Sequence, residues 1–168
     1  YRALLVMELA AKYYGNPAIN KSLWEHEQTI IKPKMIDLIA DLEAGAIDYL
    51  FSYYSEAVSK GLKYIELPDE INLGNWEYRE LYASVNVTIL KHGIPTVVKG
   101  WPILYGVAVP NNAPHYEQGI RFVEILLSQE GHDILERCGF VVLPKAYVPD
   151  VEEVPPQLRS YVQEFPSD

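Results

Sequence analysis

The sequence predicts an α/β fold with a largely parallel sheet, and three observations support this prediction. Segments of helical periodicity alternate along the chain with segments of strand-like alternation, which is the order that parallel α/β layers require. Hydrophobic residues make up 49% of the 168 residues and charged residues 22%, proportions that are typical of a folded globular chain. Glycine or proline stands at several boundaries between the expected elements.

The first part of the chain contains two expected helices. Residues 2–14 hold no Gly or Pro and are rich in good helix formers, and Gly15-Asn16-Pro17 follows as a stop signal. Residues 18–32 show no clear period and are left unassigned. A second helix is expected to begin near Pro33, which suits a first turn, and to end at Gly45.

The pattern then changes to one that is typical of strands. Aromatic and aliphatic residues alternate with other residues over 47–53, and residues 63–67 form a second expected strand. A short helix is expected between them at about 55–60, closed by Gly61. Two further β-rich runs cover residues 82–90 and 102–109.

The last third of the chain predicts more helix and a surface tail. A strong amphipathic helix is expected after Pro114, and Ser128 is placed to cap a further helix that Gly139 ends. Residues 144–168 are rich in proline, which predicts a surface-wrapping tail with at most one short helix near 158–165.

Charge and cysteine content narrow the functional classes. The net charge is −9, from 14 Lys and Arg against 23 Asp and Glu, which argues against nucleic acid or an anionic membrane surface as partner. Any anion site must therefore be built locally. The single cysteine, Cys138, excludes an internal disulfide and a thiolate zinc cluster. No run approaches the ~20 apolar residues of a membrane span.

Two helix openings are candidate anion sites. Ser52-Tyr53-Tyr54-Ser55 joins an expected strand to an expected helix, where backbone N–H groups and hydroxyls can meet an anion. The alternative is that Tyr53 is a sheet-face aromatic residue and Ser55 only a helix cap. Tyr1-Arg2 is the second opening, and its alternative is a chain end with no role in binding.

No pattern predicts an enzyme, a cofactor or a metal site. There is no nucleophile elbow, phosphate-binding glycine loop or H-E-x-x-H motif. The 13 tyrosines would suit a sugar-binding cleft, but core packing is their commoner use. The four histidines are His26, His92, His115 and His132. No two of them have the spacing that would let them bind one metal ion from the same helix.

Five runs of sequence resemble one family, the tungstate/molybdate-binding proteins of ABC importers, especially the archaeal type. These runs are residues 1–5, 42–51, 65–74, 105–114 and 122–131. The last run is shared more widely among solute-binding proteins. The resemblance implies a binding protein that acts outside the cytoplasm, in the periplasm or at the cell surface, with a membrane permease as partner.

The resemblance also implies a type II periplasmic-binding-protein fold, in which ligand lies in a cleft between two α/β lobes. Residues 1–90 would form ligand-binding lobe 2, and residues 91–143 the hinge strand and helices that return to lobe 1. Residues 144–168 would be the C-terminal tail. The chain opens without a signal-peptide pattern, so it is expected to be the C-terminal portion of such a protein, with the N-terminal part of lobe 1 missing.

The resemblance carries ligand contacts onto particular residues. The family's tyrosine contact falls on Tyr53, and Tyr1 and Arg2 match its Gly-Tyr-Arg motif. One family carboxylate would lie upstream of Tyr1. The other follows a Pro-Lys pair, and here Pro33-Lys34 is followed by Met35, whose thioether cannot replace a hard oxygen ligand. The ligand is then a tungstate- or molybdate-like oxyanion held by hydrogen bonds, or the chain is a sensing domain for a different small anion or solute.

Overall fold

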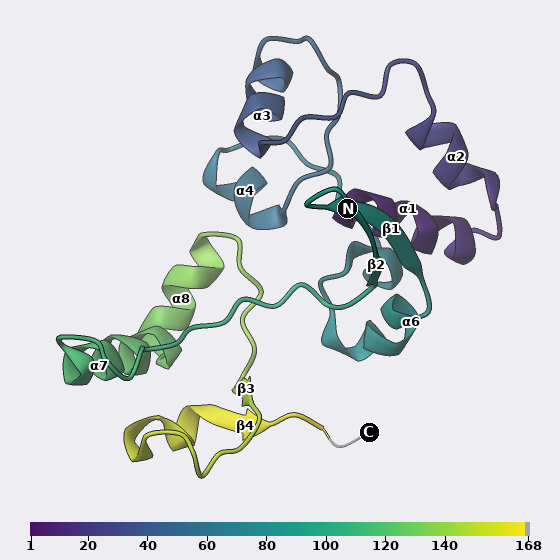
Figure 1. The fold of residues 1–168 in the computed structure, drawn as a ribbon. Coiled ribbons are helices and arrows are strands. Elements are labelled where there is room, and N and C mark those ends of the chain that lie inside the picture. The colour runs from purple at the N-terminus through teal and green to yellow at the C-terminus, as the bar shows by residue number, and fades with distance from the viewer. Residues whose placement is uncertain (167–168) are drawn as a thin grey trace. The chain divides into compact units, whose positions relative to one another are not determined.

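A computed structural model describes residues 1–166, and these contain helices with a few short strands (Figure 1). The chain divides into two compact units. Unit 1 consists of residues 1–53 and 64–104, and unit 2 of residues 54–63 and 105–168. The mixed content of helix and strand agrees with an α/β domain.

Unit 1 is built around its first helix, α1 (Arg2–Tyr13). One face of α1 is buried because Leu5, Leu9 and their neighbours recur at helical spacing. This face packs against side chains from later elements, namely Ile71, Leu73, Tyr82 and Val87. The other elements of unit 1 are α2 (Ala18–Trp24), α3 (Met35–Glu43), α5 (Asp69–Asn72), the 3-10 helix η1 (Trp76–Tyr78), α6 (Arg79–Ala83), β1 (Asn86–Lys91) and β2 (Ile94–Lys99).

Tyr82 is the most deeply buried large side chain of unit 1, with none of its surface exposed. Its hydroxyl donates to the Asp69 carbonyl and lies 3.2 Å from Asn72 Oδ1, and it accepts from the Asn75 N–H at 3.4 Å. Burial is the main cause that raises the pKa of Tyr82 above its ordinary value. One phenol therefore joins α6 to the turn that follows α5.

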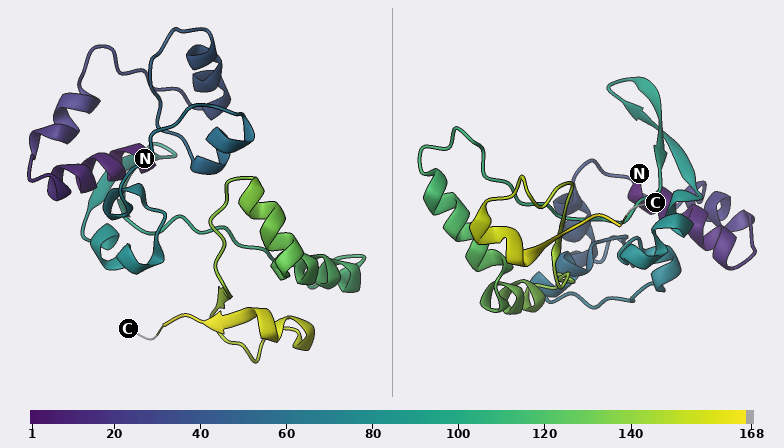
Figure 2. Two further views of the ribbon diagram at one scale, coloured as in Figure 1. Left: turned by 180° about the vertical axis from the view of Figure 1, so that it is seen from behind. Right: turned by 90° about the horizontal axis from the view of Figure 1, so that it is seen from below.

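Strands β1 and β2 form an antiparallel hairpin, with Asn86 opposite Lys99 and Lys91 opposite Ile94. The two residues between them, His92 and Gly93, have φ angles of 52° and 81°. Two positive φ values in a two-residue loop define a type I′ turn, whose twist matches that of the flanking strands. The base of the hairpin packs against the core of unit 1, and its far end projects away from the helices (Figure 2, right).

Unit 2 has its own small core, in which Ile120 and Val123 of α7 (Tyr116–Leu127) pack against Leu158. The Ser128 side chain accepts from the Gly131 N–H at 3.4 Å and so caps α8 (Gln129–Arg137). The remaining elements are α4 (Tyr54–Ser59), β3 (Ala146–Val148), the 3-10 helix η2 (Pro156–Tyr161) and β4 (Val162–Glu164), and β3 pairs with β4 in parallel.

The helix predictions are confirmed. The helices expected over 2–14 and from Pro33 to Gly45 are α1 and α3, and the short helix expected at 55–60 is α4. The helices expected after Pro114 and from Ser128 to Gly139 are α7 and α8, with Ser128 as cap. The short helix expected near 158–165 lies slightly earlier, as η2.

The strand predictions are largely wrong. Residues 47–53, 63–67 and 102–109 form no strand, and of the β-rich run 82–90 only the part from Asn86 is a strand, because α6 occupies its beginning. A strand needs a neighbour for its backbone hydrogen bonds, and sequence alternation does not supply one. Within residues 1–166 the parallel sheet is therefore replaced by two separate two-stranded sheets.

Gly100 is a position where no side chain fits. A Cβ atom there would lie 2.0 Å from the Tyr82 carbonyl oxygen, and the Gly100 N–H donates to the Val85 carbonyl at 2.9 Å. Gly100→Ala is expected to lower the free energy of unfolding by about 2 kcal/mol or more. Denaturant unfolding measures this, with Gly106→Ala as control because nothing lies within 4 Å of its Cβ position. Equal stability of the two variants would contradict the close approach.

The raised pKa of Tyr82 predicts a loss of stability in alkali. A group whose pKa is higher in the folded state contributes stability below its unfolded pKa of about 10, and this is lost as pH rises through the folded pKa. The free energy of unfolding is expected to fall more steeply above pH ~10 in the wild type than in Tyr82→Phe. Unfolding curves over this pH range, with the exposed Tyr49→Phe as control, measure the difference. If the free energy of unfolding falls equally with pH in the wild type and in Tyr82→Phe, the prediction is wrong.

Candidate anion-binding site

A pocket of about 250 Å³ lies within unit 1 at the start of α1. Three stretches distant in sequence form it: the first turn of α1, the residue after α5, and the segment that leaves β2. The lining residues are Tyr1, Arg2, Leu5, Leu73, Val98, Lys99, Trp101, Pro102 and Ile103. The last segment is held in place because the Ile103 N–H donates to the Leu73 carbonyl at 2.8 Å.

The start of α1 presents positive potential to this pocket. Tyr1 is the N-cap residue and its side chain makes no capping hydrogen bond, while the first turn contains no acidic residue. The Leu5 N–H closes the first helical turn on the Tyr1 carbonyl at 3.1 Å. The earlier N–H groups have no partner inside the helix, and the helix dipole adds to their partial positive charge.

Arg2 is fixed by Tyr53, which lies 51 residues away in sequence. Arg2 Nη1 donates to the Tyr53 hydroxyl, and the guanidinium carbon lies 5.3 Å from the centre of the Tyr53 ring and 5.7 Å from that of Tyr1. Burial lowers the pKa of Arg2, but the hydrogen bond and charge interaction with Tyr53 outweigh it, so the net pKa is raised. The guanidinium therefore keeps its positive charge in a defined orientation.

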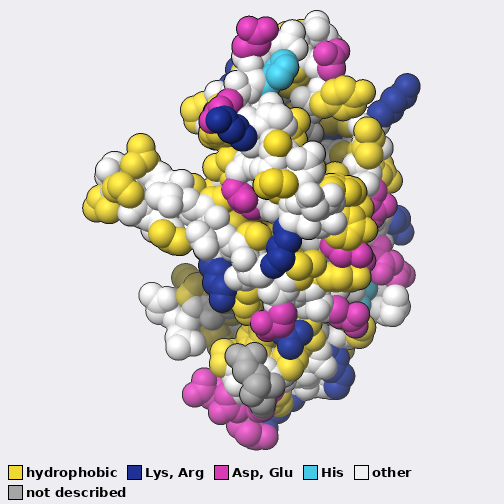
Figure 3. All heavy atoms as spheres, turned by 90° about the vertical axis from the view of Figure 1, so that its right-hand side faces the viewer, with side chains coloured by type: hydrophobic (Ala, Val, Ile, Leu, Met, Phe, Trp, Pro, Cys, Tyr) yellow, Lys and Arg dark blue, Asp and Glu magenta, His cyan; other side chains and the backbone are white. Residues whose placement is uncertain are grey.

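Neither cation of the pocket has an acidic partner. In the part of the chain that the structure describes, Arg2 and Lys99 form no ion pair, and the lining contains no Asp or Glu. Five other cations pair with carboxylates, and the rest of the described lysines and arginines, like Arg2 and Lys99, form no ion pair with a described carboxylate. The five are Lys21, Lys32, Lys60, Arg79 and Arg159. On the face shown in Figure 3, basic side chains are scattered among acidic ones. The pocket thus brings two unpaired positive charges to one lining that contains no carboxylate.

The structure brings together three of the residues singled out from the sequence, Tyr1, Arg2 and Tyr53. Met35 is the first residue of α3 and is partly buried. Ser55 lies in the first turn of α4 in unit 2, where its Cα is 2.9 Å from the Cβ position of Gly139. The ligand roles of all these residues stay predictions.

Two details of the expected junction at Tyr53 are corrected. Because residues 47–53 form no strand, Tyr53 neither ends a strand nor lies on a sheet face. The helix opening after it is real, since α4 begins at Tyr54.

Lys99 and Trp101 were missed by sequence reasoning. They flank Gly100, which passes close to the Tyr82 backbone, and no pattern in the sequence pointed to them.

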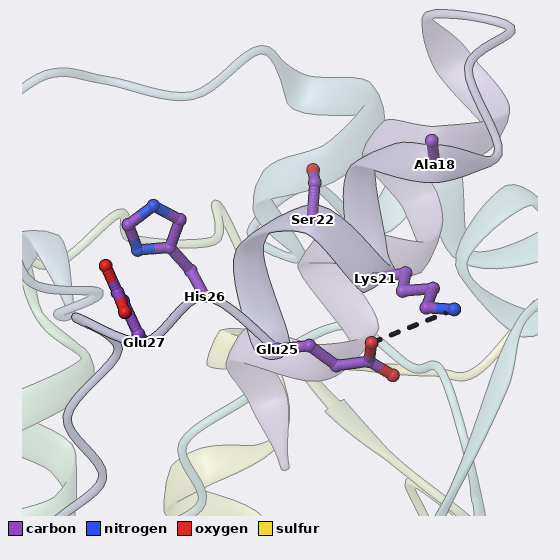
Figure 4. Close-up of a pocket in the computed structure, with 6 residues that line it drawn as sticks. All are labelled: Ala18, Lys21, Ser22, Glu25, His26 and Glu27. Atoms are coloured by element: carbon purple, nitrogen blue, oxygen red, sulfur yellow. Dashed lines mark ion pairs between the residues drawn. The ribbon is translucent and has the colours of Figure 1, made fainter.

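A second and larger hollow, of about 590 Å³, lies on the surface around α2 (Figure 4). Its lining residues are all exposed, and they are Ala18, Lys21, Ser22, Glu25, His26 and Glu27. Lys21 Nζ is 3.8 Å from Glu25 Oε2, so its charge is already paired. With two carboxylates at its rim, this open hollow is unsuited to an anion.

Within residues 1–166, no group of three or more His, Cys, Asp and Glu side chains is placed to hold a metal ion. None of the helices there is both long and apolar enough to cross a lipid bilayer.

A small pocket of hydrogen-bond donors with apolar walls is a feature of proteins that bind small molecules. Comparison of sequences gives the particular class. The family model described as "Bacterial extracellular solute-binding protein" matches residues 7–141, and the chain belongs to this family. This is a family of binding components and not of enzymes.

Individual relatives agree with this assignment and confirm the resemblance seen in the sequence. The chain is 34% identical to an uncharacterized solute-binding protein of Petrotoga mobilis, with 97% of the chain and 52% of the relative covered. It is 32% identical to the molybdate/tungstate-binding protein WtpA of Pyrococcus abyssi, with the same two coverages. For WtpA of Thermococcus kodakarensis the identity is 35%, over 97% of the chain and 51% of the relative. The chain spans about half the length of these curated relatives.

The contact between Arg2 and Tyr53 gives a stability prediction. Tyr53→Phe keeps the ring under the guanidinium but removes the hydroxyl that accepts from it. Because both residues are only partly buried, we expect the free energy of unfolding to fall by about 1 kcal/mol. Denaturant unfolding measures this, and Tyr49→Phe, at a position 80% exposed, is the matched control. A Tyr53→Phe protein as stable as that control would show that the hydroxyl contributes nothing.

Proposed function

We propose that this chain is the ligand-binding part of an ABC-transporter solute-binding protein that captures a tetrahedral oxyanion of the molybdate and tungstate class. The observation that carries the proposal is the pocket at the start of α1, where Arg2 and Lys99 have no acidic partner among residues 1–166. Arg2 is partly buried and Lys99 is exposed. A partly buried positive charge without a counter-ion favours an anionic ligand.

The chemistry of the pocket suits an oxyanion with two negative charges. Such an ion offers only hydrogen-bond acceptors, and the pocket offers donors from Arg2, Lys99 and the first turn of α1. Apolar walls formed by residues such as Leu5 and Ile103 exclude water and strengthen these interactions. The net charge of −9 is no obstacle, because the attraction is local.

The comparisons support the ligand class and the setting. Two relatives that share about a third of their aligned residues with this chain are named as molybdate/tungstate-binding proteins. The matched family is described as extracellular solute-binding proteins, which supports a location outside the cytoplasm. Delivery of the bound solute to a membrane permease is part of the proposal. In the type II fold that we propose, residues 1–90 contribute most of the ligand-binding lobe. The pocket at the start of α1 would be the part of the interlobe site that this lobe supplies.

Met35 would make the mode of binding differ from coordination by carboxylates. A thioether is a poor ligand for a hard metal centre, so the oxyanion would stay four-coordinate and be held by hydrogen bonds alone. The alternative is that Met35 has abolished oxyanion binding and that the ligand is another small solute. The titration below distinguishes this alternative from binding by hydrogen bonds alone.

Calorimetric titration of the full-length protein with molybdate, tungstate and sulfate tests the proposal. Lys99→Gln is expected to weaken oxyanion binding by roughly tenfold or more, because it removes one charge from the pocket. Lys91→Gln is the matched control, since it removes the same charge from the same hairpin away from the pocket lining. If the protein binds none of the three anions, the proposal is refuted. If Lys99→Gln and Lys91→Gln weaken anion binding equally, the pocket is not the binding site.

Met35→Glu forms a separate arm of the same titration. If the unmodified protein binds molybdate, donors alone are sufficient and the carboxylate only adjusts selectivity. Binding that begins only when Glu is introduced would show that this chain has left the oxyanion role.

A further inference from the structure

Two asparagines of the chain stand in the acceptor pattern for N-linked glycans, Asn-x-Ser/Thr with x other than proline. They are Asn20 in Asn20-Lys21-Ser22 and Asn86 in Asn86-Val87-Thr88. The pattern alone is common by chance, so accessibility in the folded chain has to decide between them. The two sites differ sharply in this respect.

Asn20 is engaged inside unit 1. It lies within α2, and its amide nitrogen, the atom that would receive the sugar, donates to Glu8 Oε1 on α1. Its side-chain oxygen is buried. The hydroxyl of Ser22 is also in use, since it donates to the Ile19 carbonyl at 3.0 Å. A glycan on Asn20 would disturb its hydrogen bond to Glu8.

Asn86 is accessible. It is the first residue of β1 and is exposed, as is Thr88, whereas Val87 between them is only 8% exposed. Side chains alternate across a strand, so burial of Val87 turns the Asn86 amide and the Thr88 hydroxyl to the same outward face. Over residues 1–166 neither side chain forms a hydrogen bond with another protein group.

We propose that Asn86 is an N-glycosylation site. The matched family model describes extracellular proteins, and the acceptor pattern is used in exported proteins. The reaction uses an oligosaccharyltransferase and a lipid-linked oligosaccharide as co-reactant. The amide nitrogen of Asn86 forms a bond to the anomeric carbon of the first sugar as the bond from that carbon to the lipid phosphate breaks. The lipid phosphate leaves and the amide gives up one proton.

A glycan at this position would have a physical role in the hairpin. In the described residues β1 pairs only with β2, so its outer edge is open to another strand. The hairpin also exposes the apolar side chains Leu90, Ile94 and Val97. An exposed edge with apolar side chains favours pairing between copies, and a bulky hydrophilic group opposes it.

The glycan would also stand close to the candidate pocket. Asn86 is directly opposite Lys99 in the hairpin, and opposite residues of an antiparallel pair have their Cα atoms about 5 Å apart on the same face. Lys99 lines the pocket. The modification is nevertheless independent of the proposed oxyanion function, because it needs only the hairpin and an extracellular location.

The test is secretion of the full-length protein from a host that N-glycosylates its exported proteins, followed by intact mass and peptide mapping. Amide-cleaving glycosidase in heavy-oxygen water converts a glycosylated Asn to labelled Asp and so marks the site. We expect one glycan, on Asn86. Asn86→Gln and Thr88→Val should each remove it, and Thr88→Ser should retain it because the acceptor pattern is preserved.

Ser22→Ala is the matched control for the second acceptor pattern. It abolishes the pattern at Asn20 without touching the hydrogen bond to Glu8, and it should leave the mass of the glycan unchanged. Circular dichroism of each variant shows that the fold is kept. A reference glycoprotein secreted by the same culture shows that the host glycosylates its exported proteins. If that reference is fully modified and Asn86 is not, the proposal is overturned. A glycan on Asn20 with Asn86 bare would overturn it equally.

Discussion

Tyr82 is completely buried in unit 1, and its hydroxyl bonds to the backbone on either side of α5. The ring belongs to the same core cluster as Leu5 and Leu9 of α1. Its carbonyl lies so close to Gly100 that the chain can pass only without a side chain there. Leu73 lies in the same core cluster as Tyr82, and Lys99 and Trp101 flank Gly100. These pocket walls therefore depend on the burial of Tyr82, and the pocket is a product of tertiary packing.

The candidate site contains few charged residues, and its lining contains no carboxylate that would neutralise them. Arg2 is held by the hydroxyl of Tyr53, where a carboxylate would have cancelled its charge. This arrangement fixes the guanidinium before any ligand arrives, so less rotational freedom is lost on binding. It also leaves the full positive charge for a ligand. An acidic chain can bind an anion in this way because interactions between exposed charges are screened beyond about 10 Å.

The sequence predicted what depends on neighbours along the chain. The helices, the stops at Gly45 and Gly139 and the cap at Ser128 are set by local periodicity and backbone preference, and all of them are present. The strands at 47–53 and 63–67 failed because a strand also needs a distant partner. The site divides in the same way. Tyr1 and Arg2 were recognised from a helix start, whereas Lys99 and Trp101 reach the pocket through a contact between Gly100 and Tyr82 that no local pattern contains.

The composition of the pocket bears on how the proposed ligand would be selected. Carboxylate ligands recognise a metal centre by bonding to it, and they distinguish molybdate from sulfate by chemistry at that centre. Arg2, Lys99 and backbone N–H groups would instead contact only the outer oxygens, which all tetrahedral dianions share. Such a site would discriminate by net charge and by the size of the cavity. With Met35 at the expected carboxylate position, selectivity among these oxyanions would then rest on how closely Tyr1, Trp101 and their neighbours fit the ion.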